Sequence, residues 1–225
     1  MKTVLNFFKE WFLDMLFPKH CILCNRLMGA GKLYCVCDKC THKLNDLRRV
    51  IIDEKSGMDE VICPFEYKDN VRNAMLDFKF RGIKYLGYTF AKEMSNMLKD
   101  RKFFEGEVII TAVPIHVTRD RVYNQSEVLA QNICKLTNKE YSGNLLYKIK
   151  PIDRISGMKV VDKKFFTKGA FHIDSRVNLT GKTVLVVDDI YTSGTTFKEI
   201  SDMLRLRGAS YVYGVTACYR EKEED

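Results

Sequence analysis

One run of thirteen residues constrains the fold of this chain more than any other feature: Val184-Leu185-Val186-Val187-Asp188-Asp189-Ile190-Tyr191-Thr192-Ser193-Gly194-Thr195-Thr196. Its four opening aliphatic residues are typical of a buried parallel strand, which is apolar on both faces. Two carboxylates follow at the carboxyl end of that strand, where open α/β sheets bind their ligands. A helical apolar pattern comes next, at Phe197, Ile200, Met203 and Leu204. The run therefore predicts a strand, a ligand-binding loop and a helix in direct succession.

The loop at residues 192–196 is small and rich in hydroxyl groups. At the start of a helix it offers free backbone N–H groups, O–H donors and the positive end of the helix dipole, so we expect it to bind phosphate. Asp188 and Asp189 would repel that phosphate, and their carboxylates suit sugar hydroxyls or a hard cation such as Mg²⁺. A strand that ends in Asp-Asp only to cap a turn is the alternative, but it explains few of these residues.

The run resembles the motif that binds 5-phosphoribosyl-1-pyrophosphate (PRPP) in the type I phosphoribosyltransferases. The resemblance implies that Asp188 and Asp189 contact the ribose hydroxyls, and that Mg²⁺ accompanies the pyrophosphate. It also implies a group of residues that holds the 5′-phosphate: Thr192, Ser193, Gly194, Thr195 and Thr196.

The eight cysteines are distributed unevenly, and five of them lie between positions 21 and 40. Cys21 and Cys24 form one CxxC pair, and Cys37 and Cys40 form a second pair after twelve intervening residues. Each CxxC turn bends two sulfurs toward one point, so the two pairs predict a structural Zn²⁺ held by four thiolates. Disulfides are not expected, because the sequence shows no secretion signal.

Other residues near these pairs leave the ligand set open. Cys35 would replace Cys37 in a less regular CxxxxC arrangement, or would stay a free thiol. His20 and His42 flank the cluster as alternative ligands, and redox-active cysteines are the other interpretation of the CxxC pairs. A closed four-thiolate site would serve folding or binding, because it leaves no coordination position open for catalysis.

The length of 225 residues suits one α/β domain with a small appendage. The formal charge of +8 indicates polyanionic partners such as nucleotides, nucleic acid or an acidic membrane surface, and a lysine-rich proteome is the alternative. Residues 1–17 are apolar but carry Lys9, Glu10 and Asp14, which makes them unsuitable as a membrane span or a signal peptide. We expect a cytoplasmic protein whose first helix docks on the body, with contact at the inner face of the membrane as the alternative.

Strands alternate with helices along the rest of the chain. Besides the strand of the acidic pair, apolar patterns predict strands at 61–67, 108–113, 171–178 and 210–218. Helical periodicity predicts helices at 41–49, 69–80, 85–99 and 126–136. This alternation favours a mainly parallel, doubly wound sheet. We place the zinc-binding module and the amino-terminal helix at 1–50 and the phosphoribosyltransferase-like domain at 51–225.

The order of these motifs and predicted elements along the chain resembles that of the ComF family, a group of bacterial phosphoribosyltransferase-like proteins. The resemblance covers essentially the whole chain. The resemblance rests on Leu16-Phe17-Pro18, the paired CxxC, Phe78-Lys79-Phe80-Arg81-Gly82, Ala112-Val113-Pro114-Ile115-His116, Asn124-Gln125 with Leu129-Ala130, Gly169-Ala170-Phe171 and the PRPP motif. It implies a type I phosphoribosyltransferase-like α/β fold, with Arg119 and Arg121 in the pyrophosphate loop. It also implies a mobile loop at residues 154–168 that closes over bound PRPP.

The chain departs from the family pattern at three places. Val122 replaces a glycine before Tyr123, and Lys163 and Phe166 stand where the mobile loop would carry Arg and Asn. Thr192 replaces the aspartate with which purine-salvage relatives handle the base, so we do not expect purine salvage. These departures leave catalytic turnover open.

Two classes of function follow. We favour a PRPP-binding protein of DNA uptake in natural transformation, which contacts single-stranded DNA through basic surface and the zinc module. The aromatic residues among basic ones at 78–81 and 163–166 would stack bases, and ordinary alternation of core and surface is the alternative. The family also implies a DNA helicase of the competence machinery as a partner. The other class is a Mg²⁺-dependent transferase that passes the phosphoribosyl group of PRPP to an unknown nucleophile and releases pyrophosphate.

Overall fold

A six-stranded, mostly parallel sheet organises the computed structural model, which describes residues 18–115, 123–148 and 171–221. The strand order is β1-β2-β8-β7-β4, and β3 also pairs with β8. The strands are β1 (Arg49–Ile51), β2 (Val61–Cys63), β3 (Phe65–Glu66), β4 (Val108–Ala112), β7 (Thr183–Tyr191) and β8 (Tyr211–Tyr219). Only the β1–β2 pair in this sheet is antiparallel among the described residues.

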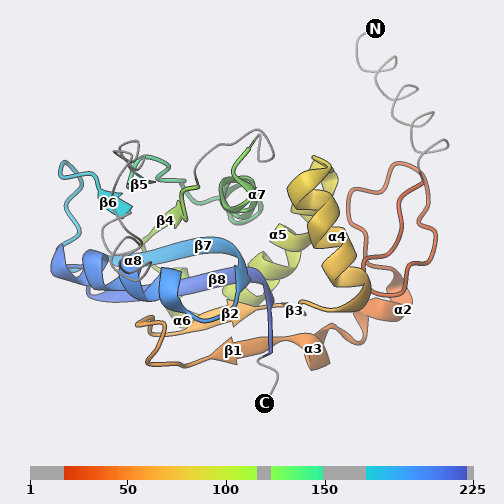
Figure 1. The fold of residues 1–225 in the computed structure, drawn as a ribbon, viewed down its shortest axis with the longest axis horizontal. Helices are drawn as coiled ribbons and strands as arrows, with labels where there is room; N and C mark the ends of the chain where they lie inside the picture. The colour runs from red at the N-terminus through yellow and green to blue at the C-terminus, as the bar shows by residue number, and fades with distance from the viewer. Residues whose placement is uncertain (1–17, 116–122, 149–170, 222–225) are drawn as a thin grey trace, which may run out of the picture.

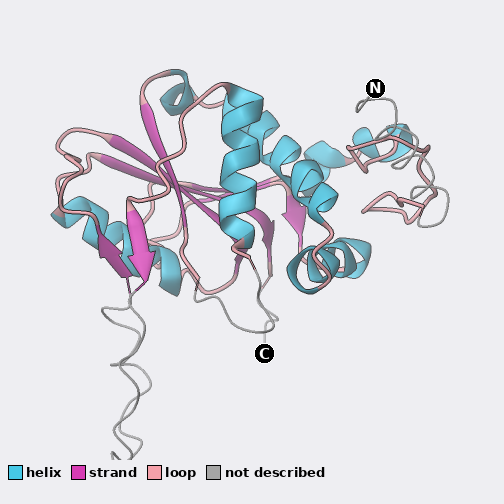
Figure 2. Ribbon diagram, turned by 90° about the horizontal axis from the view of Figure 1, so that it is seen from above, coloured by secondary structure: helices cyan, strands magenta, loops and turns pink. Residues whose placement is uncertain are grey.

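Helices cover both faces of the sheet (Figures 1 and 2). They are α2 (Asp38–Thr41), α3 (Leu44–Leu47), α4 (Asp69–Phe80), α5 (Lys84–Lys99), α6 (Lys102–Glu105), α7 (Gln125–Thr137) and α8 (Thr195–Leu206). A separate antiparallel pair, β5 (Leu146–Lys148) with β6 (Phe171–Ile173), lies near α8 at the opposite end of the molecule from the Cys-rich segment. The predicted mainly parallel, doubly wound α/β fold is confirmed.

Strand β7, which lies between β8 and β4, is buried on both faces along its aliphatic run, and the side chains of that run alternate between two hydrophobic cores. Leu185 and Val187 pack into the core that also holds buried residues of α4, α5 and α7. Val184 and Val186 pack into the second core, with buried residues of α8 and β6. This double burial is the physical reason for the unbroken aliphatic run in the sequence.

The strand that carries the acidic pair is longer than the sequence suggests. β7 continues through Asp188 and Asp189 to Tyr191, because β8 pairs with it as far as Tyr219. The pairing with β4 stops earlier, at the register of Ala112 with Val187. The acidic pair therefore lies within β7, immediately beyond the end of its neighbour β4.

Several local expectations were wrong. In place of the helix expected at 41–49, the structure has the last residue of α2 and the short helix α3. Residues 49–51 form β1, an edge strand paired with β2. Residues 61–67 form two short strands, and only residues 171–173 of the expected 171–178 strand are extended, paired with the unforeseen β5. These differences arise from pairing between distant segments, which local periodicity does not record.

The Cys-rich segment shares its core with the sheet domain. Cys35 and Val36 belong to the same hydrophobic cluster as Phe78 and Phe90. The boundary after residue 50 stays a prediction, and the helix expected within residues 1–17 lies outside the described residues. In the described part of the chain, no helix has both the length and the apolar character that crossing a bilayer requires.

Candidate functional site

A pocket lies at the carboxyl end of β7, lined by Asp188 and by the whole loop at residues 192–196. Thr192, Ser193, Thr195 and Thr196 are exposed there. Helix α8 begins at Thr195, so the wall of the pocket includes the first turn of a helix. The N–H groups of a first turn have no carbonyl partner within their own helix, and the dipole adds positive potential. The arrangement is chemically suited to an anion such as phosphate.

Gly194 is buried at the bend of this loop and has a φ of +77°. A Cβ at this position would lie 2.8 Å from Tyr191 Oη and 3.2 Å from Ser56 Cα. Tyr191 Oη in turn donates a hydrogen bond to Asp53 Oδ2 at 3.0 Å. Burial and this bond raise the pKa of Tyr191 to about 12, so the phenol stays protonated as a donor. The segment at residues 53–57 thus supports the phosphate loop from a distant part of the chain.

Asp188 is held by two hydrogen-bond donors. Its Oδ1 accepts from Ser126 Oγ at 2.8 Å and from the backbone N–H of Asp189 at 2.9 Å. Burial, and then the charge of Asp189, raise the pKa of Asp188 to about 7. The carboxyl is therefore positioned as an acceptor whose charge changes near neutral pH.

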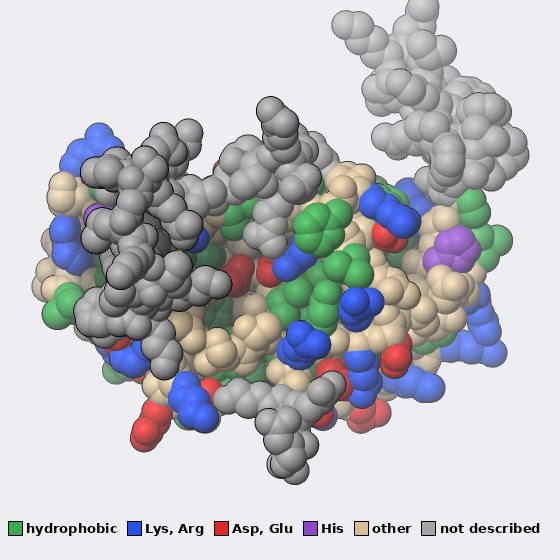
Figure 3. Space-filling view, in the orientation of Figure 1, with side chains coloured by type: hydrophobic (Ala, Val, Ile, Leu, Met, Phe, Trp, Pro, Cys, Tyr) green, Lys and Arg blue, Asp and Glu red, His purple; other side chains and the backbone are tan. Residues whose placement is uncertain are grey.

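Asp189, in β7, forms an ion pair with Lys79 of helix α4. Lys79 Nζ, near the end of α4, lies 2.8 Å from Asp189 Oδ2, and the two side chains are only 10% and 14% exposed. Figure 3 shows acidic and basic side chains side by side near the centre of that face, over β7. The negative charge of Asp189 is therefore balanced by the ammonium group of Lys79.

The start of α7 fixes these contacts. Asn124 Oδ1 accepts from the N–H of Ser126 at 3.1 Å, which caps the helix, and Asn124 Nδ2 donates to Val113 O at 3.0 Å. Gln125 Nε2 donates to Lys79 O at 2.9 Å. Asn124, Gln125 and Ser126 thus connect the end of β4, the end of α4 and Asp188.

The sequence interpretation missed Lys79 and Ser126 as members of this site. Both lie in or beside segments that carried the family resemblance, at residues 78–82 and next to Asn124-Gln125. Phe78, suggested there as a base-stacking residue, is fully buried in the core, whereas Phe80 is exposed. For Phe78, ordinary alternation of core and surface is the correct interpretation.

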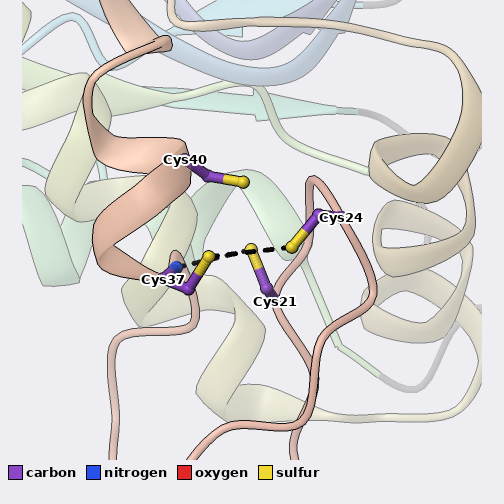
Figure 4. Close-up of side chains that lie close together, drawn as sticks. All are labelled: Cys21, Cys24, Cys37 and Cys40. Carbon is purple, nitrogen blue, oxygen red and sulfur yellow. Dashed lines mark hydrogen bonds between the residues drawn. The ribbon is translucent and has the colours of Figure 1, made fainter.

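The second cluster consists of the four cysteines predicted to bind zinc (Figure 4). The Sγ atoms of Cys21, Cys24, Cys37 and Cys40 all lie within 4.8 Å of one another, and those of Cys24 and Cys37 are 3.6 Å apart. Tetrahedral Zn²⁺ with Zn–S bonds of about 2.3 Å separates its sulfurs by about 3.8 Å. The four cysteines can therefore hold a metal such as zinc.

The backbone favours the thiolate form at Cys37, where the N–H of Cys40 lowers the thiol pKa to about 7. The N–H of Cys37 donates to Cys21 Sγ at 3.4 Å, but burial raises the pKa of both Cys21 and Cys40. Cys35 lies outside the group, with its Sγ 4.0 Å from Leu33 O. Neither His20 nor His42 joins a metal-binding group within the described residues.

Three of the predicted features lie outside the described residues. They are Arg119, Arg121 and the loop at 154–168. Their roles at the pyrophosphate stay predictions.

The match to a family model agrees with this architecture. The model of the family described as phosphoribosyl transferase domain matches residues 78–225. Competence protein F of Haemophilus influenzae is 24% identical over 200 residues, which cover 84% of this chain and 87% of that protein. Competence protein ComFC of Streptococcus pneumoniae is 29% identical over 148 residues, which cover 66% of this chain and 63% of that protein. A solved hypoxanthine phosphoribosyltransferase from Staphylococcus aureus superposes with a TM-score of 0.40 at 18% identity, covering 62% of this chain and 68% of that one.

Proposed function

This chain belongs to the phosphoribosyl transferase domain family as a ComF-type protein, and from that premise we propose that it binds PRPP in the pocket at the end of β7. The observation that carries the proposal is that Asp188 and the loop at 192–196 line one pocket. The loop would bind the 5′-phosphate through N–H and hydroxyl donors. Asp188 and Asp189 would accept hydrogen bonds from the ribose hydroxyls.

Mg²⁺ would enter this site with its ligand. Carboxylate oxygens suit Mg²⁺, but Asp188 already accepts two hydrogen bonds and Asp189 is paired with Lys79. Mg²⁺ is usually bound in proteins by one or two carboxylates together with substrate phosphates and water. When bound, it would offset the charge of the pyrophosphate, with Arg119 and Arg121 as further cations from the chain.

Calorimetric titration with PRPP, with and without Mg²⁺, tests this assignment. The double variant Asp188→Asn with Asp189→Asn is nearly isosteric and should abolish binding while keeping the fold. Asp202→Asn is the control, because Asp202 lies on α8 but is 52% exposed and paired with Lys198. Equal affinity of the double variant and the wild type would contradict the assignment.

Transfer of the phosphoribosyl group is the second candidate, supported by the same pocket. The bond from C1 of the ribose to pyrophosphate would break, a bond from C1 to the acceptor nucleophile would form, and pyrophosphate would leave. Two carboxylates beside the ribose would stabilise the positive charge that develops at C1. Release of pyrophosphate in the presence of candidate nucleophiles measures this activity.

The names of the two curated relatives support a role in competence. Within that role we propose DNA uptake as the process and a DNA helicase as the partner, as the ComF resemblance implies. The net charge of +8 supports contact with single-stranded DNA. Log affinity for oligonucleotides should then fall linearly with log salt, with a slope of about −0.7 per phosphate neutralised. Charge reversal at Lys39, or at Lys163 and Lys164, should flatten the slope, and Asp188→Asn should not. Absence of binding at low salt would remove the DNA-binding role.

We also propose that Cys21, Cys24, Cys37 and Cys40 bind one structural Zn²⁺. The geometry of their Sγ atoms supports this assignment. Zinc would stabilise a segment of short helices and loops, whose buried residues belong to the core shared with the sheet domain.

A further inference from the structure

The acidic pair and Lys79 form one charged group beside the pocket proposed to bind PRPP, and Asp188 of this group lines that pocket. Lys79 reaches Asp189 from α4, a helix that is separate from both the phosphate loop and the strand of the aspartates. The pair is largely shielded from water, since Lys79 is 10% exposed and Asp189 is 14% exposed. Burial of an ion pair costs desolvation energy, so such a pair contributes little to stability by itself.

The surrounding contacts hold Lys79 in this place. Gln125 Nε2 donates to the backbone carbonyl of Lys79, and Tyr123 Oη donates to that of Phe78. Both donors come from the segment that leads into α7, which also supplies Ser126 to Asp188. The backbone of Lys79 and the carboxyl of Asp188 are therefore held by the same short segment.

The positive charge of Lys79 changes which ligands the two aspartates can bind. Two ionised carboxylates would repel a sugar phosphate and attract a divalent cation. An ammonium 2.8 Å from Asp189 cancels one of these charges. It also occupies the space next to the carboxylate in which a bare cation would bind.

We propose that Lys79 is a positioning residue of this site: its ammonium fills the cation position at Asp189, so that the acidic pair accepts the hydroxyls of an anionic sugar phosphate instead of a bare divalent cation. The inference rests on the proposed function for the nature of the anionic ligand. The charge balance itself is testable without that ligand.

Mn²⁺ is the probe, with free Mn²⁺ measured by electron paramagnetic resonance in titrations of the full chain. Lys79→Met keeps the length of the side chain and removes its charge, and it should raise the affinity for Mn²⁺ at least tenfold. Arg81→Met is the matched control, because Arg81 lies on the same helical end but is 76% exposed and paired with Asp77. Equal Mn²⁺ affinity of Lys79→Met, Arg81→Met and wild type would overturn the inference.

A second arm separates this inference from the proposed function. The affinity for PRPP with Mg²⁺ should fall at least tenfold in Lys79→Met and be retained in Lys79→Arg. Unchanged PRPP affinity in Lys79→Met would contradict the inference and leave the PRPP site standing. If wild type fails to bind PRPP, the proposed function fails, and the Mn²⁺ result alone decides the role of Lys79.

A double variant covers the case in which Lys79→Met unfolds the protein. Lys79→Met combined with Asp189→Asn removes both charges, so no unpaired buried charge remains. This double variant should bind Mn²⁺ no more tightly than Asp189→Asn alone. Tighter binding by the double variant would show that Lys79 acts elsewhere and would overturn the inference.

Discussion

Desolvation of the half-buried carboxyl of Asp188, and then the charge of Asp189 beside it, raise the pKa of Asp188 to about 7. In an unfolded chain it would titrate near pH ~4. The folded protein therefore binds this proton more tightly than the unfolded chain does. The stabilising contribution is complete below pH ~4 and is lost as the pH rises to about 7.

Asp188→Asn should remove this pH dependence, because an amide does not titrate in this range. The amide oxygen can still accept from Ser126 and from the N–H of Asp189, so the local structure should be kept. Between about pH 5 and 8, the free energy of unfolding of wild type should fall by about 1–3 kcal/mol relative to the variant. Urea denaturation at several pH values measures the difference. Parallel curves for the two proteins would contradict the raised pKa.

Gly194 gives a second prediction at the residue scale. Its φ of +77° disfavours any side chain, and a Cβ would also collide with Tyr191 Oη. Gly194→Ala should therefore destabilise the fold by about 1–3 kcal/mol and weaken phosphate binding. Gly181→Ala is the matched control, because Gly181 has a φ of +74° with no atom within 4 Å of the added Cβ. Equal effects of the two variants on thermal stability would exclude the proposed crowding.

At the scale of elements, the Cys-rich segment should depend on its metal. Purified protein should contain about one Zn²⁺ per chain, measured by elemental analysis. Cys21→Ser, Cys24→Ser, Cys37→Ser and Cys40→Ser should each lose metal, because three remaining ligands hold zinc poorly. Cys35→Ser is the control and should keep it. Loss of metal in Cys35→Ser with retention in Cys37→Ser would reverse the ligand assignment.

Helix α5 connects this segment to the sheet domain through a buried carboxylate. Glu93 is 1% exposed, and its oxygens accept from Tyr34 Oη at 2.6 Å and pair with Arg48 Nη2 at 3.3 Å. One turn earlier on α5, Thr89 Oγ1 accepts from the N–H of Cys35 at 3.0 Å. The Cys-rich segment is therefore fixed to α5 by polar contacts as well as by the shared core.

Removal of this carboxylate should be costly, because it leaves the half-buried partners Tyr34 and Arg48 without their acceptor. Glu93→Ala should lower the free energy of unfolding by about 3–5 kcal/mol. Glu107→Ala, which breaks the exposed pair with Lys182, should cost no more than about 1 kcal/mol. Chemical denaturation compares the two variants. Similar costs for both would contradict the role of Glu93.

For the whole molecule, the sequence predicts those parts whose pattern is local. Neighbouring residues alone were enough to predict three features: the buried strand β7, the loop at 192–196 and the cluster of four cysteines. Lys79 and Asp53 could not be found in this way, because their partners Asp189 and Tyr191 lie more than one hundred positions away in the chain. Strand β1 was missed for the same reason, since it exists only through its pairing with β2.

The central claim is that the pocket at the end of β7 binds PRPP, and ³¹P nuclear magnetic resonance tests it most directly. In a titration of Mg²⁺ and PRPP with the full chain, the 5′-phosphate signal should shift and saturate at one ligand per chain. Asp188→Asn with Asp189→Asn should abolish this saturable shift. A 5′-phosphate signal that stays unchanged with wild type, or that shifts equally with the double variant, would contradict the account.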